Sequence, residues 1–60
     1  MTIRENQIWY LTSLDTLVIT TNVNILSIEY FFISKNLKMK LTGVDFLGTF
    51  RDDFEYIGEL

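Results

Sequence analysis

The chain has no cysteine, histidine or proline among its 60 residues, and it also lacks alanine. Without cysteine and histidine it cannot form a disulfide, use a thiol nucleophile or imidazole base, or build the usual zinc site. Hydrophobic residues make up 48% of the chain, and the absence of alanine makes them large. This composition excludes a disordered chain, which is poor in aromatic and β-branched residues. At this length it predicts one small domain, residues 1–60.

Charge is unevenly distributed along the chain, and the formal net charge is −3. The central region holds Lys35, Lys38 and Lys40, whereas five of the eight acidic residues lie at or after Asp45. The chain therefore lacks the cluster of basic residues that a phosphate backbone requires, and we expect no direct binding of nucleic acid. The acidic end suits a basic partner protein, although ordinary solubilising charge explains it as well.

Membrane and export signals are also missing from the sequence. The longest apolar stretch, residues 25–33, is interrupted by Ser27 and Glu29 and is far too short to cross a bilayer. The first twenty residues lack the basic start, apolar run and small cleavage residues of a signal peptide. Because cysteine is absent as well, we expect a soluble cytoplasmic protein that does not contact a membrane.

Apolar periodicity predicts an α+β fold: a small antiparallel sheet of three to four strands with one short helix. Residues 7–13 alternate as a strand does, although a helical stripe also fits them. Residues 17–21 are β-branched and predict a second strand. The following Asn22-Val23-Asn24 is typical of a turn, because asparagine tolerates left-handed backbone.

Residues 25–33 give the strongest strand signal, and this strand is apolar on both faces. A strand of that kind is either central and covered on both sides by its own domain, or covered on one side by its domain and on the other by a partner. A chain of this size has little left to supply the second cover, so we expect a homodimer.

The next segment predicts a hairpin loop at residues 34–36 and a returning strand at residues 37–42. In that strand Lys38 and Lys40 alternate with apolar residues and are expected to face water. They suit an acidic contact, but charged protection of an exposed strand against edge pairing explains them better.

The C-terminal third allows two interpretations. A capping-box spacing at residues 42–45, followed by apolar residues three and four apart, predicts a short helix over residues 43–50. The competing interpretation is a strand at residues 46–50 followed by a turn at 51–53. Both interpretations end in a strand over residues 54–58.

The sequence offers few groups for chemistry. Asp52, Asp53 and Glu55 are close enough in sequence to hold a hard cation, but they lack the calcium-loop pattern and are typical of a solvated turn. The three glycines are too far apart for a phosphate-binding loop. We therefore predict a protein that is not an enzyme and that uses no metal and no cofactor.

The order of features in the second half resembles one known family. An aromatic strand containing an acid (Ile28-Glu29-Tyr30-Phe31-Phe32) leads through a turn at Lys35 to Asp45-Phe46-Leu47-Gly48-Thr49-Phe50. This arrangement is similar to that of the small, acidic, dimeric uracil-DNA glycosylase inhibitors of Bacillus phages. The resemblance covers roughly the last forty residues and is one of pattern.

The resemblance implies a three-stranded antiparallel sheet with one helix, paired into a dimer that imitates DNA. In that family an Asp-Phe-x-x-x-Tyr run on the helix supplies two aromatics to a pocket for a leucine of the glycosylase. Asp45, Phe46 and Phe50 match this run, with phenylalanine in place of tyrosine. The implied partner-binding residues are Phe46, Phe50, Asp45, Glu29, Asp52, Asp53 and Glu55. The implied location is the cytoplasm of the host cell.

The sequence departs from the family at several points. The loop between Lys35 and Asp45 is longer, Leu47 replaces an acid, and the turn at residues 22–24 has no acidic run. A generic small acidic interaction module, which forms oligomers and is of phage or plasmid origin, therefore remains an alternative. Two further alternatives are a small barrel, which needs the last twenty residues to be all strand, and a small enzyme subunit with carboxylates between chains.

Overall fold

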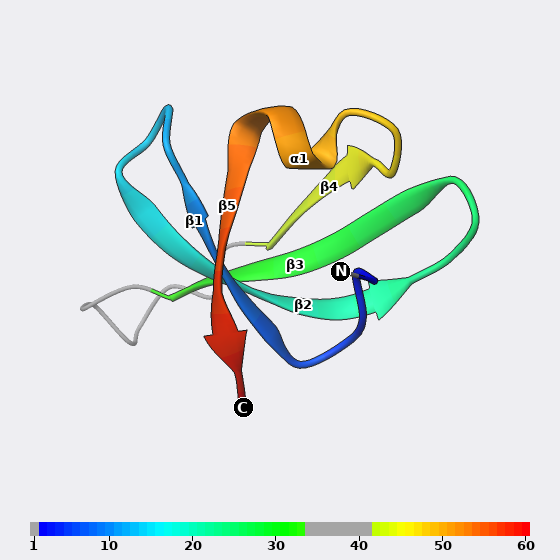
Figure 1. Ribbon diagram of the computed structural model, residues 1–60, viewed down its shortest axis with the longest axis horizontal. Helices are drawn as coiled ribbons and strands as arrows, with labels where there is room; N and C mark the ends of the chain where they lie inside the picture. Colours follow the sequence, from blue (N-terminus) through cyan, green and yellow to red (C-terminus); the bar gives the residue numbers. More distant parts are fainter. Residues whose placement is uncertain (1, 34–41) are drawn as a thin grey trace.

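A computed structural model gives the structure of residues 2–33 and 42–60 (Figure 1). The elements, in chain order, are β1 (Gln7–Leu11), β2 (Thr16–Val23), β3 (Ser27–Ile33), β4 (Thr42–Phe46), α1 (Phe50–Asp53) and β5 (Phe54–Glu59). The strands form one antiparallel sheet in the order β4-β3-β2-β1-β5. The expected antiparallel sheet with one short helix is confirmed, but the sheet has five strands instead of three or four.

The expected strands at residues 7–13, 17–21, 25–33 and 54–58 are found as β1, β2, β3 and β5. The expected loop at 34–36 lies outside the described residues. So does the expected strand at 37–42, apart from Thr42.

The turn between β2 and β3 begins later than predicted. β2 continues to Val23, because Asn22 and Val23 still pair with β3 beyond a bulge in the register. The turn begins at Asn24, whose Oδ1 accepts hydrogen bonds from the backbone N–H groups of Leu26 (2.9 Å) and Ser27 (2.8 Å). The predicted turn at residues 22–24 thus included the asparagine that forms it, Asn24, but it began two residues too early.

The predicted helix over residues 43–50 is wrong. Residues 42–46 form β4, in which Val44 lies opposite Glu29 and Gly43 lies opposite Tyr30. Pairing with the exposed edge of β3 outweighs a weak helical pattern that contains two glycines and β-branched residues. The helix consists of a single turn and lies further along the chain, at Phe50–Asp53, where the competing interpretation predicted a turn at residues 51–53.

The sheet curls until its distant strands meet across the interior. Three strand spacings separate β3 from β5 along the sheet, about 14 Å if the sheet were flat. The ring centroids of Tyr30 on β3 and Phe54 on β5 are nevertheless 5.2 Å apart. Figure 1 shows the result, with β1 and β5 crossing β2 and β3 at a steep angle. The fold is therefore a small open barrel, although α1 interrupts the all-strand C-terminal region that the barrel alternative required.

Aromatic rings fill the interior of this barrel. Phe50 is fully buried; its ring stacks on Phe54 (4.1 Å between centroids) and meets the edge of Trp9 (5.0 Å). Because α1 carries Phe50, this one helical turn closes the end of the barrel between β4 and β5. Edge-to-face and offset rings of this kind stabilise a core beyond the area that they bury.

Two polar side chains, Gln7 and Thr20, are also fully buried, and both are hydrogen-bonded. Gln7 Oε1 accepts bonds from the backbone N–H of Arg4 (2.8 Å) and from Trp9 Nε1 (3.2 Å). Thr20 Oγ1 accepts a bond from the Gln7 N–H (3.0 Å) and donates to the Arg4 carbonyl (2.5 Å). These bonds attach the N-terminal segment to the sheet.

Among residues 2–33 and 42–60, no helix has the length and apolar character that a bilayer crossing requires.

Candidate functional site: an apolar ladder on the outer face of the sheet

Alternation along the strands gives the sheet a second apolar face, outside the barrel. On β1 the side chains of Gln7, Trp9 and Leu11 are buried, whereas the intervening Ile8 and Tyr10 are half-buried. The same alternation on β2 and β3 completes an outward-facing set of six side chains, which we name the outer ladder. The outer ladder consists of Ile8, Tyr10, Leu17, Ile19, Phe31 and Ile33.

The strand register arranges the outer ladder in two rows. Ile8 lies opposite Ile19, which lies opposite Phe31. Cross-strand neighbours of this kind stand about 5 Å apart, so each row is a continuous apolar strip.

The second row follows the same order, with Tyr10 opposite Leu17 and Leu17 opposite Ile33. Leu17, Phe31 and Ile33 are 38%, 40% and 44% exposed, so this face keeps large apolar surfaces in water. A contiguous apolar surface of this kind is typical of an interaction site.

Carboxylates border the outer ladder. The Tyr10 hydroxyl donates a hydrogen bond to Asp15 Oδ1, and Glu55 lies opposite Tyr10 on β5. The hydrogen bond to Asp15 is the main cause that raises the pKa of Tyr10, and the charge of Glu55 adds to it. On the other side Glu29 lies two residues before Phe31 on β3, on the same face.

The cations of the described residues lie elsewhere. Arg4 forms an ion pair with Glu59, next to the N-terminal end of β1. The guanidinium of Arg51 lies over the Trp9 ring, 5.7 Å from its centroid. Within residues 2–33 and 42–60, the border that Asp15, Glu29 and Glu55 form is therefore acidic.

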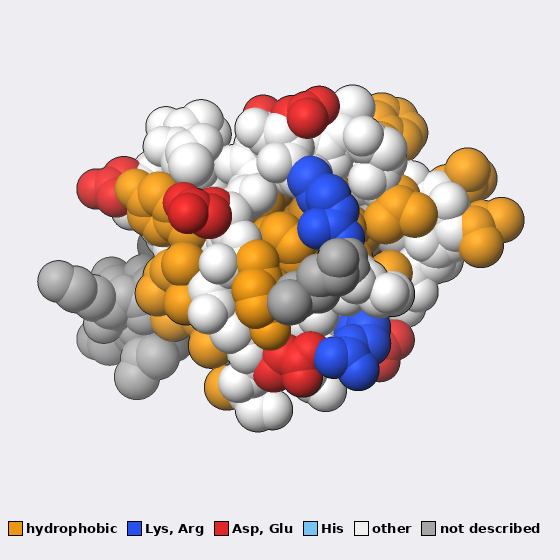
Figure 2. Space-filling view, in the orientation of Figure 1, with side chains coloured by type: hydrophobic (Ala, Val, Ile, Leu, Met, Phe, Trp, Pro, Cys, Tyr) orange, Lys and Arg blue, Asp and Glu red, His pale blue; other side chains and the backbone are white. Residues whose placement is uncertain are grey.

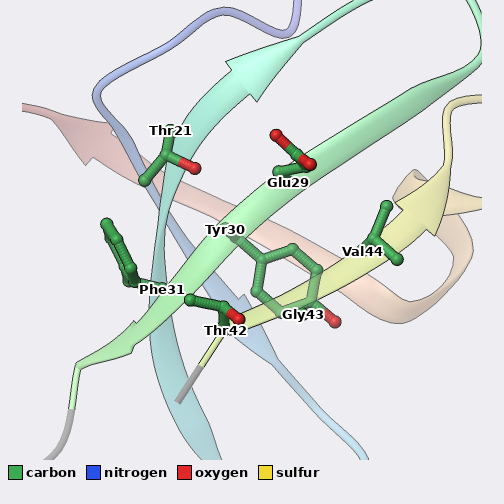
Figure 3. Close-up of a pocket in the computed structure, with 7 residues that line it drawn as sticks. All are labelled: Thr21, Glu29, Tyr30, Phe31, Thr42, Gly43 and Val44. Carbon is green, nitrogen blue, oxygen red and sulfur yellow. The ribbon is translucent and has the colours of Figure 1, made fainter. Parts of the chain in front are cut away.

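A hollow of about 430 Å³ adjoins the outer ladder between β2, β3 and β4 (Figure 3). It is lined by Thr21, Glu29, Tyr30, Phe31, Thr42, Gly43 and Val44. Gly43 makes this arrangement possible, because a Cβ there would lie 2.6 Å from the Tyr30 ring and 2.7 Å from its hydroxyl oxygen. The Tyr30 ring is mostly buried, and this burial raises its pKa.

The two phenylalanines expected to form one pocket do not face a common surface. Phe46 ends β4 and is 73% exposed, whereas Phe50 is fully buried against Trp9 and Phe54. The predicted role of Phe50 in partner binding is therefore wrong: the four-residue spacing does not lie on one helix, and the barrel needs this ring in its core. Phe46 stays available to a partner.

Phe46 belongs to a small exposed apolar tip that includes Ile25 (87% exposed) and Leu26 (72%) in the turn between β2 and β3. The backbone N–H of Leu47 donates to the Leu26 carbonyl (2.9 Å), which holds the end of β4 beside this turn. Figure 2 shows hydrophobic side chains at the surface over this turn, at the right of the view.

The remaining predicted acids have different environments. Asp45 has a structural role, because its Oδ1 accepts bonds from the Phe46 N–H (2.8 Å) and Thr49 Oγ1 (3.3 Å). Asp52 and Asp53 are exposed on α1. In the part of the chain that the structure describes, no group of three or more acidic side chains is placed to hold a metal ion.

Comparisons of this chain with protein-family models, with curated proteins and with solved structures gave no significant match.

Proposed function

We propose that this chain is a small acidic protein-interaction module that binds its partner through the outer ladder. One observation carries the proposal: two cross-strand apolar rows, with Leu17, Phe31 and Ile33 exposed and the other members half-buried, lie on a sheet whose other face already holds the core. Burying such a surface is the main driving force of protein association. The barrel itself does not use it.

The border defines the chemistry of the partner. Asp15, Glu29 and Glu55 surround an apolar centre, which suits a protein surface with an apolar middle and basic residues around it. In such an interface the buried aromatic and aliphatic groups supply most of the affinity, and the charges at the rim mainly increase the association rate. We expect that high salt lowers the association rate but does not abolish binding.

The test compares two variants of the whole chain. In Leu17→Ser/Phe31→Ser each row loses one exposed apolar side chain; Leu60→Ser removes an equally apolar side chain that is 80% exposed outside the outer ladder. Both immobilised variants are tested for partner capture after circular dichroism confirms that they are folded. We expect the ladder variant to lose partners that the wild type and Leu60→Ser retain. Identical sets of retained proteins would contradict the proposal.

A narrower candidate is the DNA-imitating inhibitor of a uracil-DNA glycosylase that the resemblance implies. It is favoured by the exposed Phe46 and by the exposed acids Asp52, Asp53 and Glu55. Two features depart from the family: the sheet has five strands, and the second aromatic of the motif is in the core.

A uracil-excision assay with a bacterial glycosylase tests this candidate directly. Stoichiometric inhibition that persists at moderate salt and weakens in Phe46→Ala supports it. No inhibition at a large excess of folded protein removes it and leaves the general module.

The expected homodimer stays a prediction. Its measurement is the molar mass in solution, by light scattering over a range of concentrations. A dimer that Leu17→Ser/Phe31→Ser dissociates would make a second copy the occupant of the outer ladder.

A further inference from the structure

The hollow between β2, β3 and β4 combines three kinds of group around one space (Figure 3). Glu29 contributes a carboxylate, Phe31 and Val44 contribute apolar walls, and Thr21 and Thr42 contribute hydroxyl groups. The lining is thus polar at some points and apolar at others.

We propose that this hollow receives an arginine side chain of the partner protein. The inference rests on the proposed function and names the chemistry of one anchor on the partner.

The carboxylate of Glu29 is oriented so that it can bind a cation. Its Oε2 accepts a hydrogen bond from Asn22 Nδ2 (3.1 Å), which orients the carboxylate. Among the described residues Oε1 accepts no hydrogen bond, so it can accept one from a ligand. A carboxylate that is held in position from one side loses less side-chain entropy when it binds.

The other groups favour arginine over lysine. A guanidinium is planar, carries five donors and stacks on aromatic faces, whereas an ammonium is a strongly hydrated point charge. Phe31 is 40% exposed and offers a ring to the guanidinium and its methylene stem. The hydroxyls of Thr21 and Thr42 offer acceptors for donors that Glu29 does not take.

The size and position of the hollow agree with this occupant. An apolar cavity of about 150 Å³ accepts benzene. The hollow, at about 430 Å³, is large enough for an arginine side chain with some water. Phe31 belongs to both the hollow and the outer ladder, so an arginine at the edge of an apolar partner surface reaches the hollow while the ladder is covered.

The experiment is an NMR titration of the full, ¹⁵N-labelled chain with three blocked tripeptides. They carry arginine, lysine or citrulline between two alanines; citrulline keeps the shape of arginine and lacks its charge. We expect saturable shifts of the Phe31, Thr42 and Val44 amides with the arginine peptide, at a Kd of roughly millimolar order for so small a ligand. The lysine peptide should bind several-fold more weakly than the arginine peptide. The citrulline peptide should bind at least about tenfold more weakly than the arginine peptide.

Two matched variants locate the interaction. Glu29→Gln keeps the shape of the side chain and should weaken arginine binding about tenfold, because a charge-assisted bond becomes a neutral one. Glu5→Gln removes an exposed acid that lies outside both the hollow and the outer ladder, and it should change the Kd by less than about twofold.

Equal binding of arginine and citrulline overturns the proposal, because the hollow would then not recognise the charge. Equal losses in the two variants also overturn it, because they mean unspecific attraction to acidic residues. Shifts confined to amides away from the hollow overturn it too. If the arginine peptide causes no shifts but partner capture depends on the outer ladder, the arginine site alone is rejected. If the arginine peptide binds in the hollow but partner capture does not depend on the outer ladder, the docking face alone is rejected.

Discussion

The two faces of the sheet have similar apolar side chains but different surroundings. On the inner face Trp9, Val18 and Ile28 are covered because the sheet curls and α1 closes its end. On the outer face Phe31 and Ile33, from the same strand as Ile28, stay about two-fifths exposed. The difference comes from what lies opposite each face, because residues 2–33 and 42–60 supply one covering layer and no second.

The two faces also treat polar groups differently. Inside, Gln7 and Thr20 are buried and hydrogen-bonded to the N-terminal segment, as burial requires. Outside, carboxylates stay at the border of the outer ladder, where water solvates them. The inner face therefore stabilises the fold, and we assign binding to the outer face.

The largest expected effect separates Phe50 from Phe46. Phe50→Ala should lower the free energy of unfolding by about 3–5 kcal/mol, because it leaves a cavity between Trp9 and Phe54. The whole chain is expected to have roughly 3–9 kcal/mol, so this variant is close to unfolding. Phe46→Ala, the matched control, should cost less than about 1 kcal/mol because this side chain is mostly in water. Urea unfolding followed by tryptophan fluorescence measures both. Equal losses would mean that the two rings are in similar environments.

A second variant is at Gly43, which contacts the mostly buried Tyr30 ring and also lines the hollow. Gly43→Ala should cost about 1–3 kcal/mol, because the new methyl overlaps the Tyr30 ring, and either the ring or β4 must move. Gly58→Ala is the control, since a Cβ there has no atom within 4 Å. Thermal unfolding of both variants provides the measurement. A Gly43→Ala protein as stable as the control would show that the ring is free to move aside.

Removal of apolar area from the outer ladder should affect stability less than either of these core changes. Phe31→Thr keeps a β-branched residue in β3 and should change the free energy of unfolding by less than about 1 kcal/mol. The same variant should reduce partner binding strongly, because aromatic anchors dominate interfaces. Chemical unfolding and binding are measured on one preparation. A large loss of stability would place Phe31 in the core and contradict the division between faces.

The smallest effect concerns how the contacts of Glu59 with Gln7 and Arg4 make the free energy of unfolding depend on pH. The hydrogen bond from Gln7 Nε2, with a further contribution from Arg4, lowers the pKa of Glu59 below its ordinary value, although desolvation opposes this. A lowered folded pKa means that the ionised form favours folding above the ordinary value of about 4.3, and that this contribution disappears as the pH falls through the folded pKa. In urea unfolding between pH 6 and 3, the wild type should therefore lose its advantage over Glu59→Gln. An advantage that is independent of pH would remove this assignment.

The strands could be read from the sequence because their signal is local. The β-branched residues of β2 and the aromatic residues of β3 indicate strands whatever their neighbours are, whereas the alternation of Gln7 to Leu11 left a helical stripe open as well. The doubly apolar character of β3 also indicated an outer apolar surface. The membership of Tyr10, Leu17 and Ile19 was missed, because it depends on a register that only the assembled sheet defines.

The C-terminal third could not be read in the same way. Residues 42–50 carry a capping-box spacing and a helical apolar pattern, and both are local signals. What decides the outcome is the exposed edge of β3, which pairs with residues 42–46, and the open end of the barrel, which takes Phe50. Neither is encoded within a few residues, so the spacing of Phe46 and Phe50 suggested a shared surface that does not exist.

Asp45 has a consequence for the behaviour of the protein at high concentration. Among the described residues β4 pairs only with β3, and such an edge is a template on which another chain could add a strand. Asp45 occupies the N–H of Phe46, and Thr49 occupies its carbonyl (3.2 Å). This shortens the template by one residue at the end that lies beside the exposed apolar tip. A carboxylate that resembled part of an inhibitory motif thus protects one residue of the β4 edge from the addition of another strand.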